Sequence, residues 1–177
     1  GRCEKGVNMA EAEKAVALLK EHFERYYDEA EGTLAESVGV VAFGEEQTEC
    51  IRKLVRADRE LRAKIDRALS NFKDVPEKLI FFKTIETVQG QETAQLILSL
   101  TYGKTAEGKT VNSFGQLNRD KLGKCIFNVA VTRAQCGVAV IHSVRAEEIT
   151  GESVSYIREY LELAARFAED GRSQFVS

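Results

Sequence analysis

The sequence contains little of what characterises membrane-spanning, disulfide-linked or low-complexity proteins. Its 177 residues include one proline, one methionine, two histidines and no tryptophan. Glycine or polar residues interrupt every apolar run before it reaches the length of a transmembrane helix. The first residues also lack the charged-then-apolar pattern of a leader. We therefore expect a protein that neither enters a membrane nor is visibly exported.

The four cysteines, Cys3, Cys50, Cys125 and Cys136, form no C-x-x-C pair, and neither histidine lies near them at metal-ligand spacing. This pattern favours free thiols in a reducing compartment over disulfides or a metal site. We expect a cytoplasmic protein with no metal ligands of its own.

The composition, with 44% hydrophobic and 30% charged residues, is that of a globular protein long enough for one good core. We expect one domain. The net charge is -3, so any nucleic acid must be held by local contacts rather than by the charge of the whole chain. Because the first methionine is Met9, we expect that the chain is part of a longer protein.

Hydrophobic periodicity predicts alternating helices and strands. Asn8 is a candidate N-cap, with Glu11 at the capping-box position, for a helix over 10–27. Its apolar stripe comprises Ala12, Ala15, Val16, Leu19 and Phe23. Further helices are predicted over 45–69, 119–135 and 154–170, and buried strands over 38–43, 79–82, 95–102 and 137–143.

Strands that alternate with helices predict an α/β fold, a mostly parallel open sheet with helices on both faces. Ligands of such folds usually lie at the carboxyl ends of the strands, where the loops converge. We expect the functional motifs at that edge.

The segment GKTAEGKT, Gly103 to Thr110, matches the P-loop pattern G-x-x-x-x-G-K-[ST]. A P-loop must lead directly into a helix whose first turn holds the phosphates. The next residues, VNSFGQLN, begin a helix poorly. We therefore interpret the segment as a surface loop with Lys104 and Lys109 in solvent.

Two other segments carry residues suited to nucleotide chemistry. In TIETVQGQE, 84–92, Gly90 would let the backbone approach a ligand and Glu92 could accept hydrogen bonds from sugar hydroxyls. In NVAVTRAQ, 128–135, Arg133 precedes a buried strand, and its guanidinium suits a transferring phosphoryl group. Each residue also has a structural alternative: a turn for Gly90, a strand cap for Glu92 and a surface ion pair for Arg133.

Together these segments resemble the second RecA-like motor domain of superfamily 1 helicases, in the branch of the nonsense-mediated-decay helicase. The segments 114–120 and 146–164, AEEITGESVSYIREYLELA, look closest to large multidomain prokaryotic helicases. The matching segments are VNMAEAEKAV (7–16), VGVVAFGEEQ (38–47, motif IV), TIETVQGQE (84–92, motif V), FGQLNRD (114–120) and FNVAVTRAQCGVAVIHS (127–143, motif VI).

The resemblance implies that ATP lies between two RecA-like domains, and that the first domain supplies the P-loop and the Mg²⁺ ligands. Arg133 would be the arginine finger of that site. Glu92 would hold the ribose, Gln89 and Gly90 would shape the adjacent turn, and Gln47 would lie near the nucleotide edge of the cleft.

The resemblance also implies that the chain grips single-stranded DNA or RNA through its backbone. Thr84 would bond a phosphate of the strand, with Thr87 beside it, and the loop that carries them would couple this contact to the state of the ATP.

Several residues depart from the family pattern, which has charged residues at the positions of Gln91, Ala94, Cys125 and Ile126, and threonine at that of Ala42. These changes remove charge without affecting Arg133. They keep a second function open, that of a non-catalytic RecA-like module that binds nucleic acid or protein. The third function that stays open is that of an independent P-loop NTPase.

Overall fold

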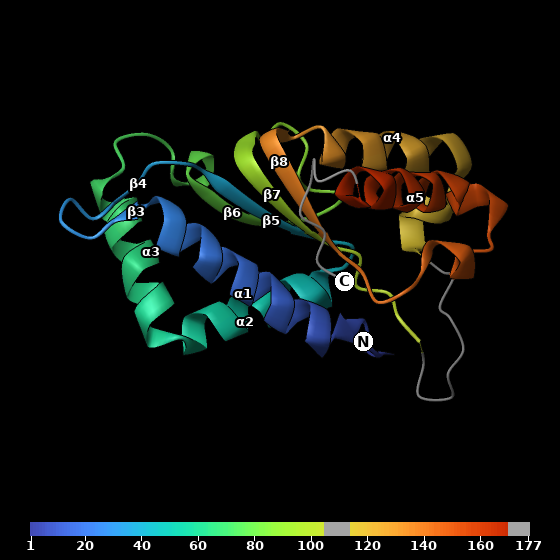
Figure 1. Cartoon of the computed structure of the whole chain (residues 1–177), viewed down its shortest axis with the longest axis horizontal. Coiled ribbons are helices and arrows are strands. Elements are labelled where there is room, and N and C mark those ends of the chain that lie inside the picture. The colour runs from blue at the N-terminus through green and yellow to red at the C-terminus, as the bar shows by residue number, and fades with distance from the viewer. Residues whose placement is uncertain (105–113, 170–177) are drawn as a thin grey trace.

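A four-stranded parallel sheet forms the centre of the computed structural model, which describes residues 1–104 and 114–169 (Figure 1). Its strands lie in the order β6-β5-β7-β8. They are β5 (Val38–Ala42), β6 (Ile80–Thr84), β7 (Thr93–Ser99) and β8 (Ala134–Ile141). In β5 all five residues are buried, which explains why its sequence is a continuous apolar run rather than an alternating one.

Helices cover both faces of this sheet. On one face lie α1 (Met9–Tyr26), α2 (Glu45–Ala57) and α3 (Arg59–Asn71), and on the other lie α4 (Asp120–Val131) and α5 (Ser155–Glu169) (Figure 1). The predicted fold class, an α/β RecA-like domain with a parallel open sheet, is confirmed.

The smaller elements of the described residues are two hairpins and four short 3-10 turns. The hairpins are formed by β1 (Cys3–Glu4) with β2 (Val7–Asn8), and by β3 (Tyr27–Asp28) with β4 (Thr33–Leu34). The 3-10 turns are η1 (Pro76–Lys78), η2 (Gly115–Asn118), η3 (Ala146–Glu148) and η4 (Glu152–Val154).

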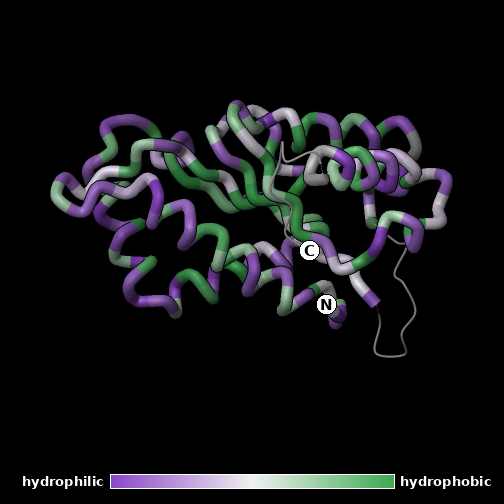
Figure 2. The backbone as a smooth tube through the Cα atoms, in the orientation of Figure 1, coloured by the Kyte–Doolittle hydropathy of each residue, from purple (hydrophilic) through white to green (hydrophobic). Residues whose placement is uncertain are grey.

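Two hydrophobic cores lie on opposite faces of the sheet, and Figure 2 shows the apolar strands between them. Successive strand residues point to opposite faces. In β7, Ile97 therefore packs in the core under α1, whereas Leu96 and Leu98 pack in the core under α4 and α5.

Helix α1 begins as predicted, because the Asn8 side chain accepts a hydrogen bond from the Glu11 N–H. Its apolar stripe is buried, as expected. The prediction of a capping box is wrong, however. The Glu11 carboxylate bonds the Asn8 side-chain amide, and the Asn8 backbone N–H donates to Gln47 Oε1 at 2.8 Å.

The single helix predicted over 45–69 is also wrong, because the chain forms two helices that meet at Asp58. The backbone of Asp58 is extended, with φ -82° and ψ 103°, and its carboxylate accepts a hydrogen bond from the Leu61 N–H at 3.0 Å. Asp58 thus starts α3 as its N-cap. The apolar spacing is similar on both sides of this break, so periodicity alone did not reveal it.

The P-loop lookalike falls mostly on residues 105–113, outside the described part of the chain. The first described element after it is the 3-10 turn η2 rather than an α-helix. Lys104 differs from the expectation, because its ammonium pairs with the Glu148 carboxylate at 2.7 Å instead of lying free in solvent.

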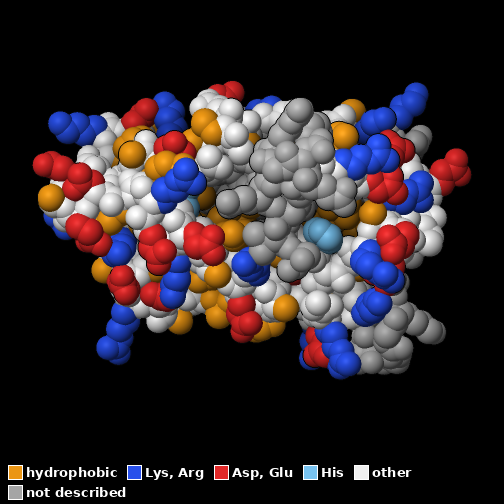
Figure 3. Space-filling model, in the orientation of Figure 1, with side chains coloured by type: hydrophobic (Ala, Val, Ile, Leu, Met, Phe, Trp, Pro, Cys, Tyr) orange, Lys and Arg blue, Asp and Glu red, His pale blue; other side chains and the backbone are white. Residues whose placement is uncertain are grey.

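No helix in the described ranges is long and apolar enough to cross a membrane. Figure 3 shows acidic and basic side chains interspersed over the face that carries α1, so the net negative charge is not concentrated there.

Candidate functional site

The amino-terminal edge of the sheet brings Arg133 and Glu92 together. Both residues immediately precede their strands, and β7 and β8 pair in parallel from Thr93 and Ala134 onward. The Thr93 N–H donates to the Arg133 carbonyl at 3.0 Å. Next to this bond, Gln135 Nε2 donates to Glu92 Oε2 at 3.2 Å. The expectation that these motifs lie at the carboxyl ends of the strands is therefore wrong for both residues.

The Arg133 side chain is half-buried against the end of α4. Its Nε–H donates to the Val129 carbonyl at 2.8 Å, and one terminal nitrogen lies 3.5 Å from Thr132 Oγ1. These contacts cap the last turn of the helix, where a cation is favourable. Among the described residues no carboxylate forms an ion pair with Arg133, so its charge is available to an anionic ligand.

A tight turn just before Glu92 contains Gln89 and Gly90. The Gln91 N–H donates to the Val88 carbonyl at 3.1 Å, and Gly90 has a φ of +81°, as the third residue of a type II turn requires. A Cβ placed on Gly90 would meet nothing within 4 Å. The glycine is thus required by the backbone angle, and the space beside it is open to a ligand.

The threonine pair lies at the opposite, carboxyl edge of the sheet. Thr84 ends β6 and is 6% exposed, and its hydroxyl lies 3.0 Å from the hydroxyl of Thr87. The Thr87 side chain also accepts from the Thr84 N–H at 3.0 Å and is exposed. Thr87 is therefore the member of the pair that is accessible from solvent.

The structure does not bring Gln47 together with Arg133 and Glu92. Its side chain is 0% exposed at the carboxyl edge, which lies about 20 Å away along β7 at 3.3 Å per residue. The Gln47 amide donates to the Asn8 carbonyl at 3.1 Å and to Ser99 Oγ at 3.2 Å. Since its oxygen also accepts from the Asn8 N–H, every polar group of this amide is engaged.

A buried polar network, missed by sequence reasoning, surrounds Gln47. The Glu11 carboxylate, 2% exposed, accepts hydrogen bonds from Ser99 Oγ at 2.8 Å and from the Thr101 N–H at 2.7 Å. Burial raises the pKa of Glu11, and the bonds from Ser99 and Thr101 oppose this shift. The available signal was the position of Glu11 on the apolar stripe of α1, four residues before Ala15.

This network occupies the place where ligands bind in most open α/β sheets. The connections after β5 and β7 leave in opposite directions, so the switch point lies between the carboxyl ends of these two strands. Gln47 and Glu11 fill that point from α2 and α1. The carboxylates of Glu45 and Glu46 in the first turn of α2 further disfavour an anion there.

One loop connects the two edges. Residues 85–92 start beyond Thr84 at the carboxyl end of β6 and finish at the amino end of β7. Ile85 and Val88 are buried in the core under α4 and α5, so the start and the middle of the loop are fixed to the sheet.

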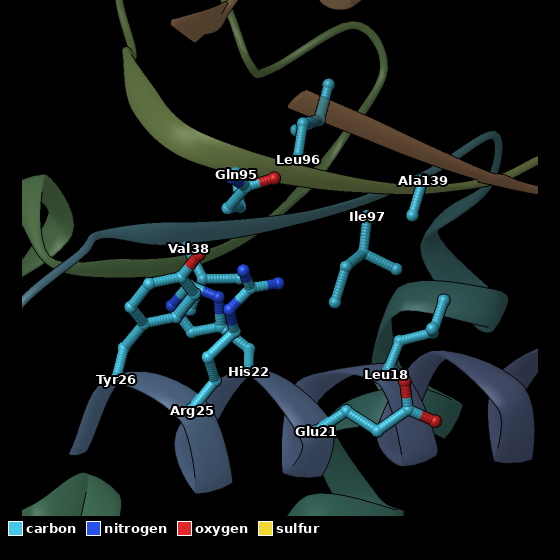
Figure 4. A pocket seen from close by; sticks show the side chains of 10 residues that line it. All are labelled: Leu18, Glu21, His22, Arg25, Tyr26, Val38, Gln95, Leu96, Ile97 and Ala139. Carbon is cyan, nitrogen blue, oxygen red and sulfur yellow. The ribbon is translucent and has the colours of Figure 1, made fainter. Parts of the chain in front are cut away.

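A cavity of about 180 Å³ lies between α1 and the sheet, and Figure 4 shows its lining. His22, Arg25 and Tyr26 of α1 face Val38 and Gln95 there. A ring nitrogen of His22 lies 2.9 Å from the Glu36 carbonyl, and burial lowers its pKa. None of the site residues predicted from the sequence lines this cavity. The described residues also contain no group of three His, Cys, Asp or Glu that could hold a metal ion.

Comparison with known proteins assigns the family. A family model described as AAA domain matches residues 2–145. The uncharacterized ATP-dependent helicase MG140 of Mycoplasma genitalium is 32% identical over 120 residues, which cover 67% of this chain and 10% of the relative. Its homolog in Mycoplasma pneumoniae is 30% identical over 118 residues, or 66% of this chain and 10% of the relative. The chain thus spans about a tenth of the length of these relatives, and on the family match it belongs to the AAA domain family.

Proposed function

We propose that residues 1–177 form the second RecA-like domain of an ATP-dependent superfamily 1 helicase or translocase. The observation that carries the proposal is the position of Arg133. Its guanidinium is held by the Val129 carbonyl, has no carboxylate partner among the described residues and lies on the same edge as Glu92. The similarity to two proteins named as ATP-dependent helicases supports the same assignment.

In this function ATP binds to a partner RecA-like domain, which provides the P-loop and the Mg²⁺ ligands. Arg133 faces the γ-phosphate and neutralises the charge that spreads over it during transfer to water. Glu92 accepts hydrogen bonds from the ribose, and the open space beside Gly90 lets the backbone approach the nucleotide. Gln47 supports the fold in this scheme and does not contact ATP.

Single-stranded DNA or RNA lies at the other edge, where Thr87 contacts a backbone phosphate and Thr84 holds Thr87 in place. The loop 85–92 touches both edges, so closure around ATP would move the nucleic-acid contact through one rigidly anchored segment.

The test is nucleic-acid-stimulated ATP hydrolysis by the full-length protein. Arg133→Ala is expected to lower the rate by about 10³-fold, the usual effect of removing an arginine finger. Arg158→Ala is the matched control, because Arg158 is also half-buried and also donates to a single described carbonyl, that of Ile149 at 3.2 Å. If Arg133→Ala hydrolyses ATP at the wild-type rate, the motor assignment is wrong.

A non-catalytic RecA-like module is the second candidate, and the uncharged residues at 91, 94, 125 and 126 favour it. It predicts nucleic-acid or protein binding by the full-length wild type with no stimulated hydrolysis. The isolated chain is expected to hydrolyse no ATP under either function.

A further inference from the structure

A groove between α2, α3 and the outer edge of β6 lies outside the sites described above. It encloses a cavity of about 350 Å³. Its floor is apolar and formed by Val55, Ile65 and Phe82, whereas Arg52, Arg56 and Arg62 line its sides. Among the described residues that line it, Asp66 is the one with an acidic side chain. The groove is thus locally positive in a chain whose net charge is -3.

Two of the three arginines are available to a ligand. Arg56 is exposed and forms no ion pair with any described residue. Arg62 Nε lies 3.6 Å from Asp66 Oδ2, with both side chains more than half exposed, and such pairs are weak. Arg52, in contrast, is fixed, because it pairs with Glu49 at 2.5 Å and donates to the Phe82 carbonyl at 2.6 Å.

The contact of Arg52 also blocks one kind of partner. The Val38 N–H bonds the Leu79 carbonyl, and the Ile85 N–H bonds the Ala42 carbonyl. In β6, every second residue counted from Leu79 therefore faces β5, and the residues in between turn their peptide groups away from it. Phe82 is one of these, and its outward carbonyl is already occupied by Arg52. A peptide that adds a strand to β6 would have to displace this guanidinium.

Strand β6 links the groove to the candidate nucleic-acid contact, because Phe82 lines the groove and Thr84 ends the strand. Phe82 and Thr84 are two residues apart on β6, which corresponds to about 7 Å. A separation of this size is within the reach of neighbouring nucleotides of one strand. A strand that contacts Thr87 through one phosphate and follows β6 toward its start would bring later phosphates to the groove that Arg56 and Arg62 line.

We propose that this groove binds the phosphate backbone of the same DNA or RNA strand, with Arg56 and Arg62 as the phosphate contacts. The inference rests on the proposed function, because it needs a strand at Thr87. Since the contacts are charged and reach no base edge, they add affinity without sequence preference.

The test measures binding of fluorescein-labelled oligo(dT) and oligo(U) to the full-length protein by anisotropy at several salt concentrations. Each phosphate contact to a single strand contributes about 0.7 to the slope of log K against log[salt]. The double variant Arg56→Ala/Arg62→Ala is expected to reduce this slope by about 1.4 and to weaken binding at least tenfold at low salt. The control Arg25→Ala/Arg166→Ala removes two exposed arginines elsewhere and should keep the slope.

Each outcome separates this inference from the proposed function. If the wild type binds and the groove variant shows the same salt slope, the groove does not bind the strand. The helicase assignment is then unaffected. Absence of binding by the wild type overturns the nucleic-acid contact itself. If the wild type binds poly-glutamate more tightly than oligo(dT) and oligo(U), and only the groove variant loses it, the groove takes an acidic protein partner and the inference fails.

Discussion

Glu11 is the buried carboxylate on which the polar network converges. Donors from different parts of the chain converge on it, among them the Ser99 hydroxyl, the Thr101 N–H and the Asn8 amide. Removing an acceptor from buried donors costs about 1–3 kcal/mol of unfolding free energy. We therefore expect Glu11→Ala to destabilise the protein by about that amount in urea denaturation.

The destabilisation by Glu11→Ala should depend on pH. Burial raises the pKa of this carboxyl in the folded state above its unfolded value. Between the two pKa values the folded protein binds more protons, so the stability contributed by Glu11 is complete below about pH 4.3 and falls as pH rises through the folded pKa. Denaturation of wild type and variant from pH 4 to 8 should show the difference shrinking. A difference that grows with pH would contradict this view of the network.

The residue scale also shows the limits of the sequence. Arg133 and Glu92 were chosen for their chemistry, and they prove to be neighbours because β7 and β8 pair directly after them. The fold class predicts them at the carboxyl edge, the usual ligand position, but Gln47 and Glu11 fill that position. The pairing of α1 with the end of β7 spans about ninety positions in sequence, and local patterns contain no such information.

At the scale of elements, apolar periodicity predicted the four central strands and the helices α1, α4 and α5, although with shifted ends. It failed at the junction of α2 and α3, where the polar cap at Asp58 decides the structure. Asp58 bonds the Leu61 N–H and also pairs with Lys20 of α1, which lowers the pKa of the Asp58 carboxyl. One side chain therefore starts a helix and ties it to another.

Two substitutions separate these roles of Asp58. Asp58→Asn keeps an oxygen for the cap but loses the ion pair, whereas Asp58→Ala loses both. Caps typically contribute about 1 kcal/mol and exposed ion pairs less. In urea denaturation at pH 7 the alanine variant should be less stable by about that amount, with the asparagine variant close to wild type. If the two variants are equally destabilised, the ion pair with Lys20 outweighs the cap.

At the scale of the whole molecule, the sheet separates two groups of residues that the proposed motor must connect. Arg133 and Glu92 lie at its amino edge, Thr84 and Thr87 at its carboxyl edge, and the loop 85–92 joins them. A loop fixed at both ends and buried at its middle can transmit a displacement, whereas a loosely packed one would absorb it. Val88, fully buried in the core under α4 and α5, is the middle anchor.

Val88→Ala tests this coupling in the full-length protein. The variant shortens the anchor without touching either edge, so the factor by which nucleic acid stimulates ATP hydrolysis should fall several-fold while the basal rate changes little. Val154→Ala is the matched control, since Val154 is equally buried in the same core but belongs to η4. Both variants create a similar cavity, so a general loss of stability would affect them alike. If the stimulation factor falls in Val88→Ala and persists in Val154→Ala, the coupling belongs to the loop. Equal stimulation factors in the two variants would refute the role of the loop.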